Sequence, residues 1–199
     1  MIENITVNAQ SSIRIQDSNR VIYADPFKIR KDTHDADFIL LTHDHFDHFS
    51  PEDILKVAKI DTILVVPGTM MGKARTVASS VGDIRMVKPG ESGDIDGLEY
   101  ETIPAYNVGK SFHKKSAGWV SYILTLGGKR IYIAGDTDKN PDNEKVKCDI
   151  AMVPIGGTFT MDASEAAELI NVIQPEVAIP IHYGDGAGSK SEVKVFINW

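Results

Sequence analysis

A short apolar run followed at once by a dense polar segment constrains the fold of this chain most. Phe38-Ile39-Leu40-Leu41 is followed by Thr42-His43-Asp44-His45-Phe46-Asp47-His48, which holds three of the chain's six histidines. The apolar run is typical of a buried strand, so the polar segment is expected in the loop at its end. The alternative is a polar surface loop that happens to be rich in histidine. A position directly behind a buried strand favours a functional cluster instead.

The spacing within this segment indicates two directions for its side chains. Imidazole nitrogens and carboxylate oxygens bind Zn²⁺, Mn²⁺ and Fe ions. Residues two apart in an extended segment point to one side, so His43, His45 and Asp47 can converge. His48 would face elsewhere unless a helix begins nearby. The following Ser50-Pro51-Glu52-Asp53 has the residues of a helix start, namely an N-cap serine, a proline and two acids.

Composition and charge limit the class of protein. The chain has 199 residues, 42% of them hydrophobic and 25% charged, which predicts one soluble domain over residues 1–199. Its net charge of −7 disfavours nucleic acid as the main partner, although Lys110, His113, Lys114 and Lys115 form a small basic patch. The N-terminus lacks a basic and apolar leader, and no segment approaches the roughly 20 apolar residues of a membrane span. We therefore expect a cytoplasmic protein without membrane contact.

The single cysteine excludes an internal disulfide. Cys148 precedes an apolar run, which favours a small buried side chain over a reactive thiol. No Ser-His-Asp or Cys-His arrangement is apparent in the sequence.

The pattern of apolar runs predicts two sheets with helices outside. Strands are expected at 2–8, 12–16, 20–24, 38–41, 62–66, 84–87, 98–103, 119–126, 129–134, 150–154 and 177–181, and helices at 51–59, 69–80 and from Asp162 onward. The first half is rich in antiparallel strands and the second half mixes strands with helices. Such an order favours two sheets packed face to face, with helices covering the outer sides.

Two further polar residues follow predicted strands. Asp136 lies in Gly135-Asp136-Thr137 after the strand at 129–134, and His182 lies in Pro180-Ile181-His182-Tyr183-Gly184 after the strand at 177–181. Taken alone, Asp136 could be a turn former and His182 a core histidine. Beside the first cluster, both are candidate ligands, because metal sites are commonly assembled from several strand ends.

The three motifs in this order resemble the metallo-β-lactamase superfamily. The chain is most similar to its small metal-dependent hydrolases, related to sugar-phosphate lactonase-like proteins, and the resemblance runs from about residue 2 to 185. It implies an α/β fold, the αββα four-layer sandwich, in which two mixed sheets pack face to face with helices outside. It also implies a binuclear site at one edge of the two sheets.

The resemblance assigns ligands residue by residue. His43 and His45 would bind the first ion with a histidine from mid-chain. Asp47, His48 and His182 would bind the second ion, and Asp136 would bridge both. Similar sequences place the mid-chain histidine in an Ala-Tyr/Phe-His pattern, whereas this chain has Ala105-Tyr106-Asn107.

The departure at Asn107 leaves His113 as the replacement. His113 lies six residues further on, and Gly109 would allow the bend that delivers it. If His113 is not a ligand, the site works with a weaker shell or with one metal. His34 matches no position of the family and is expected in a solvated loop. The end of the chain at Trp199 is a second departure, and apolar surface there is a candidate contact between subunits of a homo-oligomer.

The predicted activity is hydrolysis by a metal-bound hydroxide. Two divalent ions, Zn²⁺ first with Mn²⁺ or Fe as alternatives, would activate water and polarise a small ester, lactone or phosphodiester. Asp47 would orient the nucleophile or move its proton, and backbone N–H groups of Gly156-Gly157 could contact an anionic substrate, if they do not simply form a turn. The alternatives are a nucleic-acid phosphodiesterase of the same superfamily and a metal-binding or redox protein without hydrolytic activity.

Overall fold

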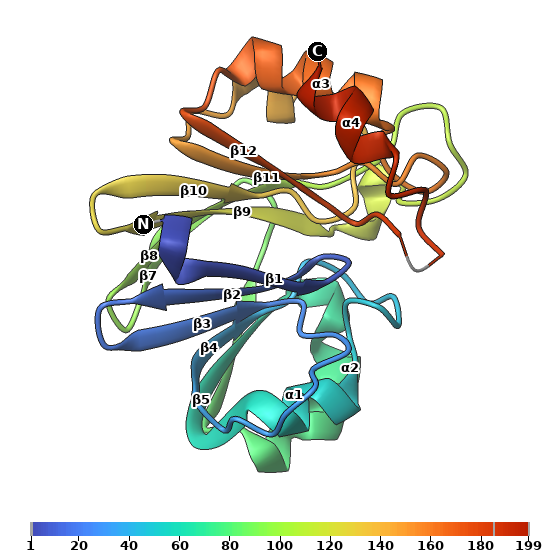
Figure 1. Ribbon diagram of the computed structural model, residues 1–199. Helices are drawn as coiled ribbons and strands as arrows, with labels where there is room; N and C mark the ends of the chain where they lie inside the picture. The colour runs from blue at the N-terminus through green and yellow to red at the C-terminus, as the bar shows by residue number, and fades with distance from the viewer. Residues whose placement is uncertain (1, 185, 199) are drawn as a thin grey trace. The chain divides into compact units, whose positions relative to one another are not determined.

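Each of two compact units is built around its own six-stranded sheet. The computed structural model describes residues 2–184 and 186–198. The units are Met1–Val87 and Lys88–Trp199, and the two sheets have the orders β1-β2-β3-β4-β5-β6 and β12-β11-β10-β9-β8-β7 (Figure 1). Both sheets are mixed, as the sequence predicts.

The first unit runs from antiparallel to parallel pairing. Its strands are β1 (Ile5–Ala9), β2 (Ser12–Asp17), β3 (Arg20–Ala24), β4 (Ala36–Leu40), β5 (Ala58–Pro67) and β6 (Asp83–Val87). The pairs β1–β2 and β2–β3 are antiparallel, and β3–β4, β4–β5 and β5–β6 are parallel. Its helices are α1 (Pro51–Val57) and α2 (Met71–Ala74), with 3-10 turns at Ile2–Asn4, Gly68–Met70 and Arg75–Ser80.

Helix α1 begins where the sequence predicts. The Ser50 hydroxyl accepts from Asp53 N at 3.3 Å, and Pro51 occupies the first turn, where its missing N–H costs nothing. The helix buries Ile54 and Val57 in a core cluster with the sheet residues Ile39 and Leu64, and α1 and α2 lie beside the sheet in Figure 1. This packing fixes the loop between β4 and α1.

The second unit shows the same order of pairing, from antiparallel to parallel along the chain. Its strands are β7 (Ser92–Ile95), β8 (Leu98–Pro104), β9 (Val120–Leu126), β10 (Lys129–Ile133), β11 (Ile150–Pro154) and β12 (Val177–Ile181). The pairs from β7 to β10 are antiparallel, and β10–β11 and β11–β12 are parallel. Its helices are α3 (Ala163–Ile173) and α4 (Glu192–Ile197), with 3-10 turns at Lys115–Ala117 and Asn143–Lys145.

Helix α3 covers one face of this second sheet (Figure 1). The Asp162 carboxylate caps it by accepting from Glu165 N at 2.8 Å, as predicted, and satisfies a donor that has no partner within the helix. Ala166 and Leu169 are buried against Ala151 and Val153 of β11. All five residues of β11 are buried, which explains its continuous apolar sequence.

Some predicted elements differ from the structure. The helix expected at 69–80 is three short helical pieces, because Gly72 and the polar residues around it provide neither an N-cap nor a continuous apolar face. The strand expected at 2–8 begins at Ile5, after a 3-10 turn. β5 begins at Ala58, so the helix before it ends earlier than predicted, and β7 was not predicted.

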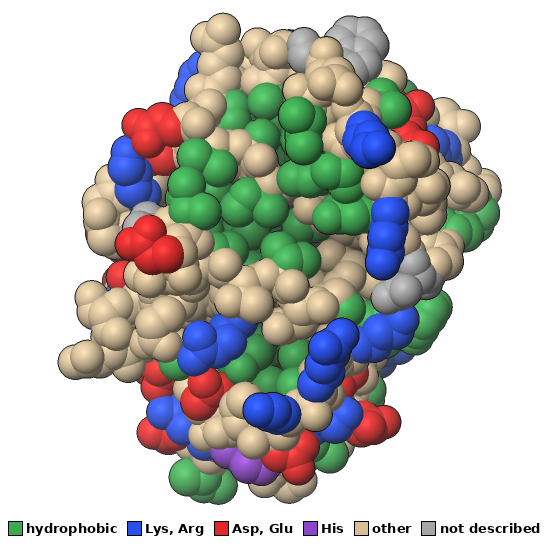
Figure 2. Space-filling model, viewed as in Figure 1, with side chains coloured by type: hydrophobic (Ala, Val, Ile, Leu, Met, Phe, Trp, Pro, Cys, Tyr) green, Lys and Arg blue, Asp and Glu red, His purple; other side chains and the backbone are tan. Residues whose placement is uncertain are grey.

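Apolar side chains gather on the second unit around its last helix. Figure 2 shows them in the part of the surface where Figure 1 draws β12 and α4. Val195 and Ile197 are 40% and 70% exposed, and a hollow of about 240 Å³ lies beside Ile170, Ala178 and Ile197. Trp199, at which apolar surface was expected, lies outside the described residues. Among the described helices, none combines the length and apolar character needed to cross a membrane.

Candidate metal centre

The histidine-rich segment forms the loop between β4 and α1, at the carboxyl end of a parallel strand. Leu41 N still donates to Val65 O at 2.9 Å, so strand pairing continues one residue beyond β4. The chain then turns after His45, whose carbonyl accepts from His48 N at 3.0 Å and from Phe49 N at 2.7 Å. The turn separates the extended part, which holds His43 and His45, from the coiled part, which holds Asp47 and His48. Asp47 therefore groups with His48 and not, as its spacing predicts, with His43 and His45.

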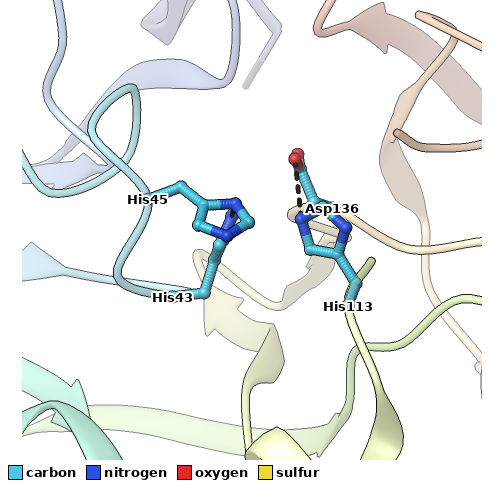
Figure 3. Close-up of side chains that lie close together, drawn as sticks. All are labelled: His43, His45, His113 and Asp136. Atoms are coloured by element: carbon cyan, nitrogen blue, oxygen red, sulfur yellow. Dashed lines mark hydrogen bonds and ion pairs between the residues drawn. The ribbon is translucent and has the colours of Figure 1, made fainter. Parts of the chain in front are cut away.

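His43 and His45 place two ring nitrogens close together. His43 Nε2 and His45 Nδ1 lie 3.1 Å apart, and the ring planes meet at 77° (Figure 3). Two nitrogens that bind one tetrahedral zinc ion at 2.0–2.1 Å lie about 3.3 Å apart. The spacing of the pair therefore fits two ligands of a single ion.

His48 is held by an acidic residue that sequence analysis did not identify. His48 Nδ1 lies 2.7 Å from Asp25 Oδ2, and both side chains are fully buried. The Asp25 carboxylate also accepts from Thr42 N at 2.8 Å and from Thr42 Oγ1 at 2.6 Å. A carboxylate on one ring nitrogen fixes the tautomer that leaves the other nitrogen available to a metal.

The sequence contains only a weak indication that Asp25 has a functional role. Asp25 follows the strand β3, just as Asp136 follows β10. Its φ of 44° is in the left-handed region, which is uncommon outside glycine and often marks a functional position. Position after a strand could have singled out Asp25, but the adjoining Pro26 makes the same sequence typical of a turn.

The two aspartates of the loop have different partners. The Asp44 carboxylate forms an ion pair with Lys73 at 2.8 Å, and Lys73 Nζ also donates to Asp44 O at 2.9 Å. Asp47 Oδ2 instead lies 3.7 Å from His48 Nε2. Asp47 and His48 thus present donors on the same side of the loop, whereas Asp44 ties the loop to α2.

In the second unit, one carboxylate lies between two histidines. Asp136 Oδ2 is 3.2 Å from His113 Nε2, and Asp136 Oδ1 is 3.3 Å from His182 Nε2; Figure 3 shows the pair with His113. All three side chains are at most 4% exposed. A buried carboxylate needs positive charge nearby to offset its lost hydration, so this donor set fits divalent cations.

The loop after β8 delivers His113 to its position in spite of the asparagine at 107. Asn107 N donates to His113 O at 2.8 Å, and Asn107 Nδ2 lies 3.4 Å from His113 Nδ1. The segment 107–113 is therefore a closed loop whose two ends are neighbours. His113 has a φ of 54° and His182 a φ of 52°, so both candidate ligands occupy the left-handed conformation.

The two glycines after β11 have another role than the one expected for them. Gly157 N donates to Met161 O at 2.9 Å within its own loop, so this N–H does not face a substrate. A Cβ at Gly156 would lie 2.6 Å from His182 O. Gly156 therefore allows the backbone to approach His182, a contact that a residue with a side chain would prevent.

The remaining candidates lie outside this set. His34 is exposed, as expected for a residue in a solvated loop, and its Nδ1 lies 2.9 Å from Ala58 O. Burial raises the pKa of the Cys148 thiol to about 11. The thiol is consequently protonated at neutral pH and is no nucleophile.

Solved structures identify the fold as that of the metallo-β-lactamase superfamily. A protein from Thermotoga maritima described as a zinc-dependent hydrolase of that superfamily superposes with a TM-score of 0.63 and 19% identity, covering 98% of this chain and 84% of its own. A protein from Parabacteroides distasonis described as a metal-dependent hydrolase has a TM-score of 0.81 and 30% identity, covering 98% of this chain and 86% of its own.

The chain belongs to the family of β-lactamase superfamily domains, whose model matches residues 4–182. A UPF0173 metal-dependent hydrolase from Staphylococcus aureus is 27% identical over 196 residues, which span 90% of this chain and 85% of the relative. The predicted family, the fold class and the class of metal-dependent hydrolase are thereby confirmed.

Proposed function

We propose that this protein hydrolyses a small ester, lactone or phosphodiester with two divalent metal ions, zinc in the first instance. The observation that carries the proposal is the Asp136 carboxylate, which has a different histidine Nε2 beside each oxygen. A carboxylate in this arrangement suits a bridge between two ions. Such ions would supply a Lewis acid and a water molecule with a pKa near neutrality.

The ligands divide into two sets with Asp136 in common. His43, His45 and His113 would hold one ion, and Asp47, His48 and His182 the other. The 3.1 Å spacing of His43 Nε2 and His45 Nδ1 supports the first set. Asp47 and His48, whose donors lie on one side of their loop, support the second.

The chain's own residues would perform three further tasks. Asp25 would hold the proton on His48 Nδ1, so that Nε2 presents its lone pair. Asp47, which is only partly buried, would orient the attacking water and accept its proton at a carboxylate oxygen. Lys73 would keep the Asp44 carboxylate away from the ligands.

The test combines metal analysis with an activity screen. Purified protein is expected to contain close to two equivalents of metal and to hydrolyse at least one of a set of lactones, 4-nitrophenyl esters and bis(4-nitrophenyl) phosphate. His43→Ala and Asp47→Asn should lower kcat by at least about 100-fold. His34→Ala is the matched control from the same unit and should retain activity.

Three outcomes would contradict the proposal. Full activity in both ligand variants would exclude the metal assignment. Salt-sensitive binding and cleavage of oligonucleotides in place of small substrates would indicate a nucleic-acid phosphodiesterase. Bound iron without any hydrolysis would indicate a redox or metal-binding protein.

A further inference from the structure

The exposed phenylalanines of this chain lie beside the candidate ligands. Among the described residues, the phenylalanines classed as exposed are Phe46, Phe112 and Phe159, at 78%, 45% and 41%. Phe46 stands between His45 and Asp47 in the sequence, and Phe112 precedes His113. Consecutive Cα atoms are 3.8 Å apart, so each of these two phenylalanines adjoins a candidate ligand along the backbone whatever the arrangement of the units.

In the second unit the rings form a pair. Phe112 and Phe159 are 4.9 Å apart between ring centroids, at an interplanar angle of 78°. Edge-to-face pairs of this kind stabilise each other beyond the burial of their surface. Asn107 Nδ2 also donates to Phe159 O at 2.7 Å, so the loop that carries Phe112 is tied to the loop that carries Phe159.

A partly buried ion pair fixes the same two loops further. Lys110 Nζ lies 2.5 Å from Asp138 Oδ1 and donates to Thr160 O at 2.7 Å. Asp138 Oδ2 accepts from Val108 N at 2.9 Å, and the Asp138 side chain is only 3% exposed. The aromatic pair is therefore held in place before any ligand arrives, which lowers the entropy cost of binding.

The first unit repeats the feature independently. The Phe46 ring makes an edge contact with Phe27, with 6.0 Å between the ring centroids. Single exposed apolar residues are common on protein surfaces. Here, however, an exposed phenylalanine adjoins a candidate metal ligand in both units, and each has an aromatic partner that orients it.

We propose that the substrate carries an alkyl or aryl group next to its scissile ester or lactone bond, and that the Phe112–Phe159 pair binds this group. This inference rests on the proposed function, because it places the apolar group beside the bond that the metal site cleaves. It narrows the substrate class to apolar esters and lactones and excludes sugar-like, fully polar ones.

Two lactones with the same ring test the proposal. For the wild-type enzyme loaded with zinc, kcat/KM measured by pH-stat should be at least about tenfold higher for γ-nonalactone than for γ-butyrolactone, because the pentyl tail of the former adds buried apolar surface. In the double variant Phe112→Ala, Phe159→Ala this ratio should fall to about threefold or less. The single variant Phe112→Leu keeps an apolar side chain at this position and should retain most of the wild-type ratio. Ile60→Ala, which truncates an exposed side chain in β5, should leave the ratio unchanged.

A binding measurement separates this proposal from the proposed function. Calorimetric titration of the zinc-loaded protein with octanoate and acetate should give tighter binding of octanoate, and the double variant should lose the difference. Equal kcat/KM for the two lactones would overturn the apolar contact and leave the hydrolase intact. Absent turnover with preserved octanoate preference would overturn lactone hydrolysis and support the contact, and equal binding without turnover would overturn both.

Discussion

At the scale of single residues, the candidate site depends on groups that hold the ligands as much as on the ligands. Asp25 accepts three hydrogen bonds, from Thr42 N, Thr42 Oγ1 and His48 Nδ1. A carboxylate that is fully buried is stable only when its lone pairs are satisfied in this way. Asp25 is thus a positioning residue for His48, and it acts through the ring rather than on a substrate.

Replacing Asp25 should weaken metal binding without removing a ligand. In Asp25→Asn an amide N–H₂ group can occupy the position of the carboxylate oxygen beside His48 Nδ1. This group donates instead of accepting, so the His48 ring loses the acceptor that fixes its tautomer. We expect zinc affinity to fall on the order of 10- to 100-fold, measured by competition with a chromogenic chelator. The matched control is Asp37→Asn, because the Asp37 carboxylate accepts from Val21 N at 2.7 Å in the same sheet. Equal zinc affinities of Asp25→Asn and the wild type would refute this role.

The sequence was sufficient to select the candidate ligands, but not the residues that hold these ligands in position. His43, His45, Asp47 and His48 stand in one dense motif, so residue type and spacing were sufficient to select them. Asp25 was missed because an aspartate before proline is equally typical of a turn. Its role depends on contact with His48, 23 residues away in the chain, and no local pattern carries that information.

At the scale of elements, short apolar runs predicted most of the strands. The residues at which strands begin and end were predicted less accurately. β11 and β12 are continuous apolar runs and were found at the predicted residues. β7, with the sequence Ser-Gly-Asp-Ile, has almost no β-branched content, and its pairing with β8 alone makes it a strand. β5 extends back to Ala58 through polar residues for the same reason, since neighbouring strands override local propensity.

The start of helix α1 is stabilised by one carboxylate. Asp53 accepts from Lys28 N at 2.9 Å and from Ile29 N at 3.0 Å, and it thereby ties the helix to the segment after β3. Asp53→Ala should lower the free energy of unfolding by about 2–4 kcal/mol, because the buried Ile29 N–H and the partly buried Lys28 N–H lose a charged acceptor. Urea denaturation measures this. Glu52→Ala, at a neighbouring exposed position of the same helix, should change it by less than about 0.5 kcal/mol.

The effect of Asp53 should depend on pH. Burial alone would raise its pKa, but hydrogen bonds from Ser50, Lys56 and the two backbone N–H groups outweigh it and lower the pKa below its ordinary value. A carboxyl with a lowered folded-state pKa stabilises the fold above its unfolded pKa of about 4 and loses this contribution as the pH falls further. The stability difference between wild type and Asp53→Ala should accordingly be constant near neutral pH and shrink below about pH 4. A difference that grows on acidification would contradict the assignment.

At the scale of the whole molecule, the proposed ligands come from both compact units. His43, His45, Asp47 and His48 belong to the first, and His113, Asp136 and His182 to the second. If one pair of ions binds both sets, metal is linked to the stability of the entire chain. Binding at a free concentration about 1,000 times the Kd would add about 4 kcal/mol to the free energy of unfolding.

Metal removal should therefore affect the two units together. Hydrogen exchange followed by mass spectrometry during an EDTA titration should show rising exchange at residues 42–49 and at residues 105–113 with the same midpoint. Strand β2, which holds none of the ligands, serves as the internal reference. Changes confined to one unit would indicate that its ligands bind an ion alone. Asp136→Asn, which removes the proposed bridge, should abolish the shared midpoint.

The closed loop 107–113 has a consequence for how this protein could change over evolutionary time. Its ends are joined by the hydrogen bond from Asn107 N to His113 O, and Val108 N and Lys110 hold the segment between them to Asp138. Phe112 takes no part in these bonds and is 45% exposed, so its exchange would alter the surface beside His113 while the histidine keeps its place. In such a chain the substrate range can change by substitution in a short loop, without any change of the candidate metal ligands.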